Sequence, residues 1–173
     1  MTQLKEFLSR RLNRREIERI VVTADLEELY RLIFNDEARI AYNALWVMTH
    51  LPREHNSWIA TKRTALIDML LSESHTGKKR MLLTLLNRLK TEKEEIRTDY
   101  LDYCFSKINS TEPYGIRALA LKQAYAQALH FPELISELRL EIEDLRSEPL
   151  SPGLKSALSQ ITRKLGDESG ARN

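Results

Sequence analysis

The sequence predicts an all-α protein, a right-handed α-α superhelix in which about four helical hairpins stack behind a short N-terminal helical cap. Three glycines, Gly77, Gly115 and Gly153, stand 38 residues apart, and each is followed two positions later by a lysine or an arginine. A period near 38 residues suits a pair of α-helices and is typical of stacked helical repeats. Only five glycines and five prolines interrupt a chain that is 42% hydrophobic and 30% charged, a composition typical of soluble helical proteins.

The second helix of each hairpin is indicated by apolar residues at helical spacing. These second helices are expected over residues 36–51, 76–90, 111–131 and 151–165. The last two open with Pro113 and Pro152, because a proline in the first turn loses no helical hydrogen bond. Ser151 supplies a capping hydroxyl, and Gly166 is expected to end the fourth helix.

The first helix of each hairpin is expected over residues 25–34, 57–71, 95–108 and 133–146, and the last three again start 38 residues apart. Short connections between partners require antiparallel neighbours. Residues 1–23 are expected to form the N-terminal cap, since the end of a solenoid needs a polar outer face. Residues 166–173 are expected to be a frayed tail. The chain is therefore expected to be a single domain over residues 1–173, with its hairpins over residues 25–165.

Two predictions concern the core. Leu82, Leu86 and Leu89 are expected to face the neighbouring helices on both sides of the second hairpin. Cys104 is the only cysteine, so no internal disulfide can form, and its place at an apolar helical position makes it a small core residue.

Charge is unevenly distributed, although the formal net charge is only +2. Residues 61–93 contain eight lysines and arginines against three acids, whereas residues 131–150 contain six acids against two arginines. Such a polarity can attract a charged partner, and it can equally be solvated helix surface. The chain has no run of about 18 apolar residues and no apolar secretion signal at its start, so we expect a cytoplasmic protein that does not enter a membrane.

In the third hairpin, the second helix begins with Ile116-Arg117, followed by Ala120. This start resembles the hydrophobic-Arg-x-x-Ala opening of the second helix in a HEAT unit. Residues 38–45 resemble the small-residue run of the same helix, whereas residues 76–90 depart from it because leucines replace its alanines. Over about residues 25–165 the chain thus resembles the HEAT and armadillo-like α-solenoids, and its layout is similar to that of short bacterial HEAT-like proteins. The resemblance implies a HEAT-like solenoid whose second helices line one curved face.

Candidate partner-contact residues are those that the second helices are expected to turn away from the core. Trp46 is the strongest single candidate, because an indole among arginine and asparagine is typical of binding hot spots. The alternatives are that Trp46 packs against the next repeat and that the whole stripe is solvated surface. The full set is Arg39, Asn43, Trp46, His50, Arg80, Thr84, Asn87, Arg88, Arg117, Tyr125 and Lys155.

Two functions from different classes follow. The first is a non-catalytic scaffold that binds an unidentified protein or peptide on the curved face. The second is a nucleic-acid-binding module resembling the HEAT-like DNA alkylation repair proteins, for which the net charge of +2 is low. The sequence shows no catalytic signature, phosphate loop or metal-ligand spacing. No catalytic, cofactor-binding or metal-binding residue is therefore predicted.

Overall fold

The computed structural model describes the backbone of residues 1–171 and the side chains of residues 1–166, and every regular element in this range is helical. The predicted all-α class is therefore confirmed. The chain divides into two compact units, residues 1–66 and residues 67–173. The right-handed superhelix and the single domain over all 173 residues stay predictions.

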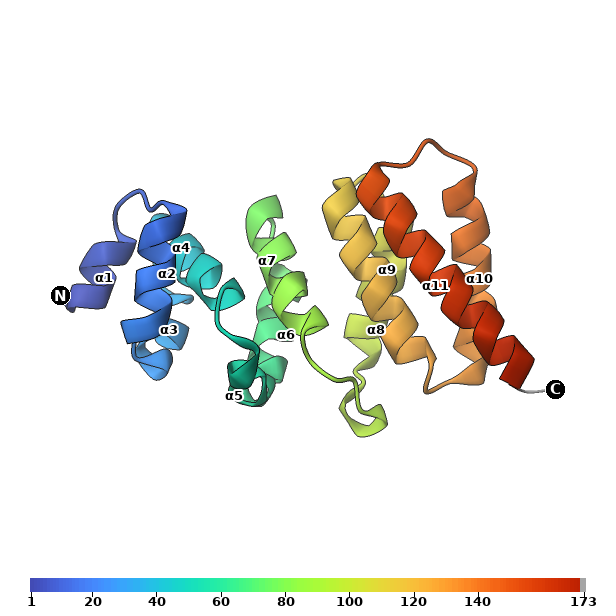
Figure 1. Cartoon of the computed structure of the whole chain (residues 1–173), viewed down its shortest axis with the longest axis horizontal. Helices are drawn as coiled ribbons and strands as arrows, with labels where there is room; N and C mark the ends of the chain where they lie inside the picture. The colour runs from blue at the N-terminus through green and yellow to red at the C-terminus, as the bar shows by residue number, and fades with distance from the viewer. Residues whose placement is uncertain (172–173) are drawn as a thin grey trace. The chain divides into compact units, whose positions relative to one another are not determined.

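The first unit is organised around α4 (Ala38–Thr49), which packs against α1 (Gln3–Leu8), α2 (Arg14–Thr23) and α3 (Leu26–Leu32) (Figure 1). The three outer helices begin at the side-chain caps Thr2, Asn13 and Asp25, each of which accepts a hydrogen bond from a backbone N–H three residues later. Asn13 and Glu16 cap each other reciprocally. The two short helices expected within residues 1–23 are α1 and α2, and their role as an N-terminal cap stays a prediction.

The first helix of the next hairpin is broken in two, which contradicts the single helix expected over residues 57–71. The 3-10 turn η1 (Arg53–His55) leads into α5 (Asn56–Thr61), and α6 (Arg63–Ser72) begins after a break at Lys62. The Lys62 ammonium lies 2.9 Å from the Glu27 carboxylate and 4.5 Å from the centre of the Tyr30 ring. The Trp58 indole N–H donates to the same carboxylate at 2.7 Å, and this bond holds the pKa of Glu27 below its ordinary value. The break thus coincides with contacts that hold α5 against α3.

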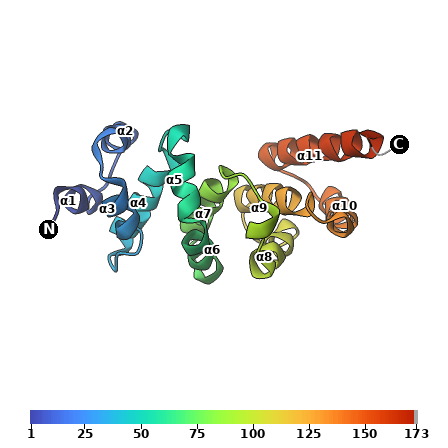
Figure 2. The same ribbon diagram turned by 90° about the horizontal axis from the view of Figure 1, so that it is seen from below.

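The second unit is organised around α9 (Tyr114–Ala128), which packs against α7 (Thr76–Asn87), α8 (Thr98–Ile108), α10 (Pro132–Arg146) and α11 (Pro152–Ala171). A 3-10 turn, η2 (Lys93–Glu95), precedes α8. In Figure 2, α8 and α11 lie on opposite sides of α9. Ala120, Ala124 and Ala128 of α9 are fully buried, and their small side chains let the neighbouring helices approach closely.

Helix boundaries agree with the predicted ones to within a few residues, except at the last helix. The Ser151 hydroxyl accepts a hydrogen bond from the Leu154 N–H at 3.3 Å, and Pro152 begins α11, as predicted. Gly166 does not end α11, because the helix continues to Ala171 and no described glycine has a positive φ. Without the left-handed conformation a glycine is an ordinary interior residue of a helix. The predicted helix end at Gly166 is therefore wrong. The frayed tail stays a prediction, and residues 172–173 lie outside the described residues.

The predicted core positions are confirmed. Leu82, Leu86 and Cys104 are fully buried, and Leu89 is 7% exposed. Burial raises the pKa of the Cys104 thiol to about 12. Because the thiolate is the reactive form of cysteine, Cys104 is an unreactive packing residue.

Replacing Leu86 by alanine is expected to lower the free energy of unfolding by about 2–5 kcal/mol, because a fully buried leucine loses its apolar contacts and leaves a cavity. Urea denaturation followed by circular dichroism measures the change. Leu140→Ala is the matched control, since Leu140 is 64% exposed and its truncation should change stability by no more than about 0.5 kcal/mol. Equal stability of the Leu86→Ala and wild-type proteins would show that the phase of α7 is misassigned.

Candidate functional site

Asn43, a predicted contact residue, is instead part of the interior of the first unit. Its side chain is 5% exposed, and its amide nitrogen donates to the backbone carbonyls of Leu8 at 2.8 Å and Arg10 at 2.9 Å. These carbonyls stand at the end of α1, where the helix itself provides no donors for them. The prediction that Asn43 turns away from the core is therefore wrong, because its amide satisfies a helix terminus.

Arg117 is also buried, at 5% exposure, and it joins three elements of the second unit. Its Nε donates at 2.8 Å to the carbonyl of Ile108, the last residue of α8, while its terminal nitrogen forms an ion pair with Glu148, which precedes α11. The guanidinium also lies 5.4 Å from the centre of the Tyr114 ring. The prediction that Arg117 contacts a partner from the surface is wrong, since all of these bonds are internal.

Lys79 occupies the same position in the 38-residue repeat as Arg117 and makes the equivalent contact. Its ammonium lies 2.6 Å from the carboxylate of Glu112, which precedes α9, and Lys107 lies 3.5 Å from the same oxygen. The hydrogen bond from Lys79 holds the pKa of Glu112 below its ordinary value, against the opposing effect of burial. Glu112 and Glu148 were not predicted as functional or structural partners. An acid in the segment before each second helix is the sequence signal that identifies them.

The other predicted contact residues differ in exposure. Trp46 is half-buried, and its ring meets that of His50 edge-on at 6.2 Å. The Thr84 hydroxyl is used within α7, where it donates to the Arg80 carbonyl at 2.7 Å. Arg88 is half-buried, and the exposed members of the set are Arg39, His50, Arg80, Asn87 and Lys155.

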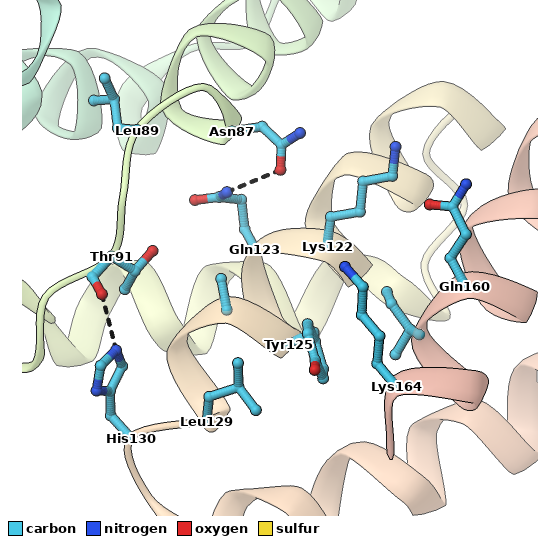
Figure 3. A pocket seen from close by; sticks show the side chains of 12 residues that line it. Asn87, Leu89, Thr91, Lys122, Gln123, Tyr125, Leu129, His130, Gln160 and Lys164 are labelled. Carbon is cyan, nitrogen blue, oxygen red and sulfur yellow. Dashed lines mark hydrogen bonds between the residues drawn. The ribbon is translucent and has the colours of Figure 1, made fainter. Parts of the chain in front are cut away.

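A pocket of about 440 Å³ lies among the second helices of the second unit (Figure 3), and we call it the second-helix pocket. Its walls come from the end of α7 with the segment that follows, from α9 and the turn after it, and from α11. Two predicted contact residues, Asn87 and Tyr125, line it; Tyr125 is 9% exposed and thus less accessible than expected. The remaining lining residues were not predicted and are Leu89, Thr91, Lys122, Gln123, Ala126, Leu129, His130, Gln160, Ile161 and Lys164.

Hydrogen bonds hold the wall between α7 and α9 in place. The Tyr100 hydroxyl donates to the Gln123 side-chain oxygen at 2.8 Å, and the Gln123 amide donates to the Asn87 oxygen at 3.1 Å (Figure 3). The His130 Nε2 atom lies 2.9 Å from the carbonyl oxygen of Thr91. Because a carbonyl only accepts hydrogen bonds, this geometry places a proton on Nε2. The wall is therefore formed by side chains that are bonded to one another before any ligand binds.

The 38-residue repeat also relates the residues of this pocket to one another. The predicted set of contact residues did not follow this repeat. A shift of 38 positions carries Asn87 onto Tyr125, Lys122 onto Gln160 and Ala126 onto Lys164. The predicted stripe started instead from Arg80 and Arg117, which are 37 residues apart and therefore lie one residue out of register. One residue corresponds to about 100° around a helix, so the predicted stripe mixed two faces.

In the part of the chain that the structure describes, no three histidine, cysteine or acidic side chains gather in a group that could hold a metal ion. No helix in that part is both long enough and apolar enough to cross a bilayer.

Comparison with known proteins identifies the repeat. A protein-family model described as a HEAT repeat domain matches residues 4–165. Neither the curated proteins nor the solved structures contain a match to this chain.

Replacing Arg117 by methionine, which keeps the length of the side chain, is expected to lower the free energy of unfolding by about 2–4 kcal/mol. The change leaves the Ile108 carbonyl and the Glu148 carboxylate without their donor. Urea denaturation measures it, with the exposed Arg80→Met as the matched control. If both variants lose the same stability, Arg117 does not have the internal role described above.

The lowered pKa of Glu112 predicts a pH dependence. A carboxyl group with a lower pKa in the folded than in the unfolded state stabilises the protein above its unfolded pKa, about 4.3, and loses this effect as the pH falls through the folded pKa. Glu112→Gln should therefore be less stable than wild type at pH 7, and the difference should shrink on acidification below about pH 4.3. Urea midpoints across this range test it, with the exposed Glu94→Gln as control. A difference that is independent of pH would contradict the prediction.

Proposed function

The chain belongs to the HEAT repeat domain family, and we propose that it is a non-catalytic scaffold that binds a protein or peptide partner on the face lined by its second helices. Protein interaction is the usual role of such helical repeats, which present extended surfaces built from many equivalent positions.

The observation that carries the proposal is the position of the second-helix pocket. Its lining comes from α7, α9, α11 and the segments that follow α7 and α9, while the first helices α8 and α10 contribute none of its residues. Its volume of about 440 Å³ lies in the range of sites that hold a small ligand or a few side chains of a peptide. Its lining combines aliphatic side chains with amides and lysines, so it offers both apolar contact and hydrogen-bond donors to a ligand.

The nucleic-acid alternative has less support, because cations that it would use are committed to internal contacts. Lys79 and Arg117 form ion pairs with Glu112 and Glu148. Binding to a phosphate backbone depends on several unpaired lysines and arginines along one surface. The internal pairs remove two members from the basic surface that the sequence suggested.

Filling the pocket tests the proposal. Ala126 is half-buried and lines the pocket, so Ala126→Trp should obstruct it while leaving the helix content by circular dichroism unchanged. Partners captured by cross-linking in lysate would be identified by mass spectrometry, and their affinities for the purified protein would then be measured by calorimetry. We expect Ala126→Trp to weaken binding by roughly tenfold or more, since hot spots cluster in pockets that a partner fills and desolvates.

The matched control is Ser136→Trp, which adds the same side chain at an exposed position of α10. A partner that binds wild type, Ser136→Trp and Ala126→Trp equally would contradict the proposed face. Loss of binding in Trp46→Ala alone would place the contact on α4 instead. Steeply salt-dependent retention on duplex DNA, with no protein partner, would favour the nucleic-acid alternative.

A further inference from the structure

We propose that the second-helix pocket binds an acidic peptide segment, with carboxylates at Lys122 and Lys164 and an apolar side chain beside Leu129. This inference rests on the proposed function, because it names the chemical class of the partner for the same pocket.

The first support is the charge of the lining. Two lysines line the second-helix pocket, and none of its described lining residues is an aspartate or a glutamate, although the chain contains 25 acids. A smaller hollow of about 190 Å³ between α8 and α10 has the opposite character, because Asp102, Glu137 and Glu141 line it. The two hollows of this unit therefore differ in the charge of their linings.

The second support is that the pocket lysines have no acidic partner within the described side chains. Other lysines are neutralised by acids of the chain, as Lys62 is by Glu27 and Lys79 by Glu112. Lys122 forms no ion pair there, and the Lys164 ammonium lies 5.7 Å from the centre of the Tyr125 ring. Figure 3 shows both side chains extending along the pocket from different helices. Two ammonium groups on separate helices can bind carboxylates of one extended segment.

The third support is the apolar surface beside the lysines. Leu129 is a large apolar residue that is 43% exposed, and it lines the pocket together with Leu89 and Ile161. Ala126 lies one helical turn after Lys122, and its small side chain leaves room on that face of α9. An apolar side chain of the ligand would gain free energy by covering this surface, which a purely ionic ligand would not exploit.

A peptide fits these observations better than a nucleic acid. Two lysines are few for a phosphate backbone, with which a protein can make about 6–10 contacts. The aliphatic surface around Leu129 also has no counterpart in a backbone of phosphates and sugars.

Three synthetic 12-residue peptides provide the test. Each has a central leucine flanked by four glutamates, four glutamines or four lysines, and binding to ¹⁵N-labelled full-length protein is followed by NMR. We expect the glutamate peptide to shift the amide signals of residues 122–130 and 160–164 and to bind at least about tenfold more tightly than the glutamine peptide. The double variant Lys122→Glu/Lys164→Glu should lose at least about tenfold in affinity for the glutamate peptide.

The matched control is Lys155→Glu/Arg163→Glu, which makes the same change in net charge at two exposed positions of α11 that do not line the pocket. Equal binding of the glutamate and glutamine peptides, equal losses in both double variants, or no shifts at the pocket would overturn the acidic-peptide inference. Displacement of the glutamate peptide by single-stranded DNA would also overturn the inference, because it would identify a nucleic acid as the occupant. A wild-type dimer that dissociates in the Lys122→Glu/Lys164→Glu variant would overturn it too, because it would identify a second copy of the chain as the occupant.

Failure of this inference can be told apart from failure of the proposed function. If Ala126→Trp abolishes partner binding while Lys122→Glu/Lys164→Glu leaves it intact, the pocket binds a partner that is not acidic. If Ala126→Trp leaves partner binding unchanged, the proposed face itself is wrong and the inference falls with it.

Discussion

The buried guanidinium of Arg117 is the contact on which the arrangement of the second unit depends. It bonds the last carbonyl of α8 and the carboxylate of Glu148 before α11, while its own backbone belongs to α9. A buried cation is unfavourable unless its donors find partners, so α9 must lie where both acceptors can be reached. Lys79 and Glu112 make the corresponding link between α7 and the segment before α9. The repeat is therefore held by ionic contacts of similar design, in addition to its leucine and alanine core.

These internal contacts determine which face of each second helix remains available. With Arg117 turned inward, the side of α9 that carries Lys122 and Ala126 lies open beside α11. The amide bonds among Tyr100, Gln123 and Asn87 then hold the adjacent wall. A ligand would thus meet a surface that is largely formed in advance, which reduces the entropic cost of binding.

Lysines in this protein have two distinct roles that residue type alone does not separate. Lys62 and Lys79 are structural, because each is bound to a carboxylate of a different element. Lys122 and Lys164 line a pocket in which none of the described lining residues carries a carboxylate. The excess of cations in residues 61–93 therefore overstates the positive charge presented to a partner. The cations that we assign to binding come later in the chain.

The sequence by itself determined the helices and their period, because apolar spacing, prolines and capping residues are local signals that act within a few residues. The burial of Leu82 and Leu86 followed for the same reason. Only the tertiary structure decided that Asn43 and Arg117 are internal, that Lys62 interrupts a helix, and that α9 and α11 form a pocket. Most of these features depend on partners about 30 residues or more away in the chain. The exception is the hydrogen bond from Arg117 to the Ile108 carbonyl, which is much nearer in the sequence. They also depend on helix phase, in which an error of one residue rotates a side chain by about 100°.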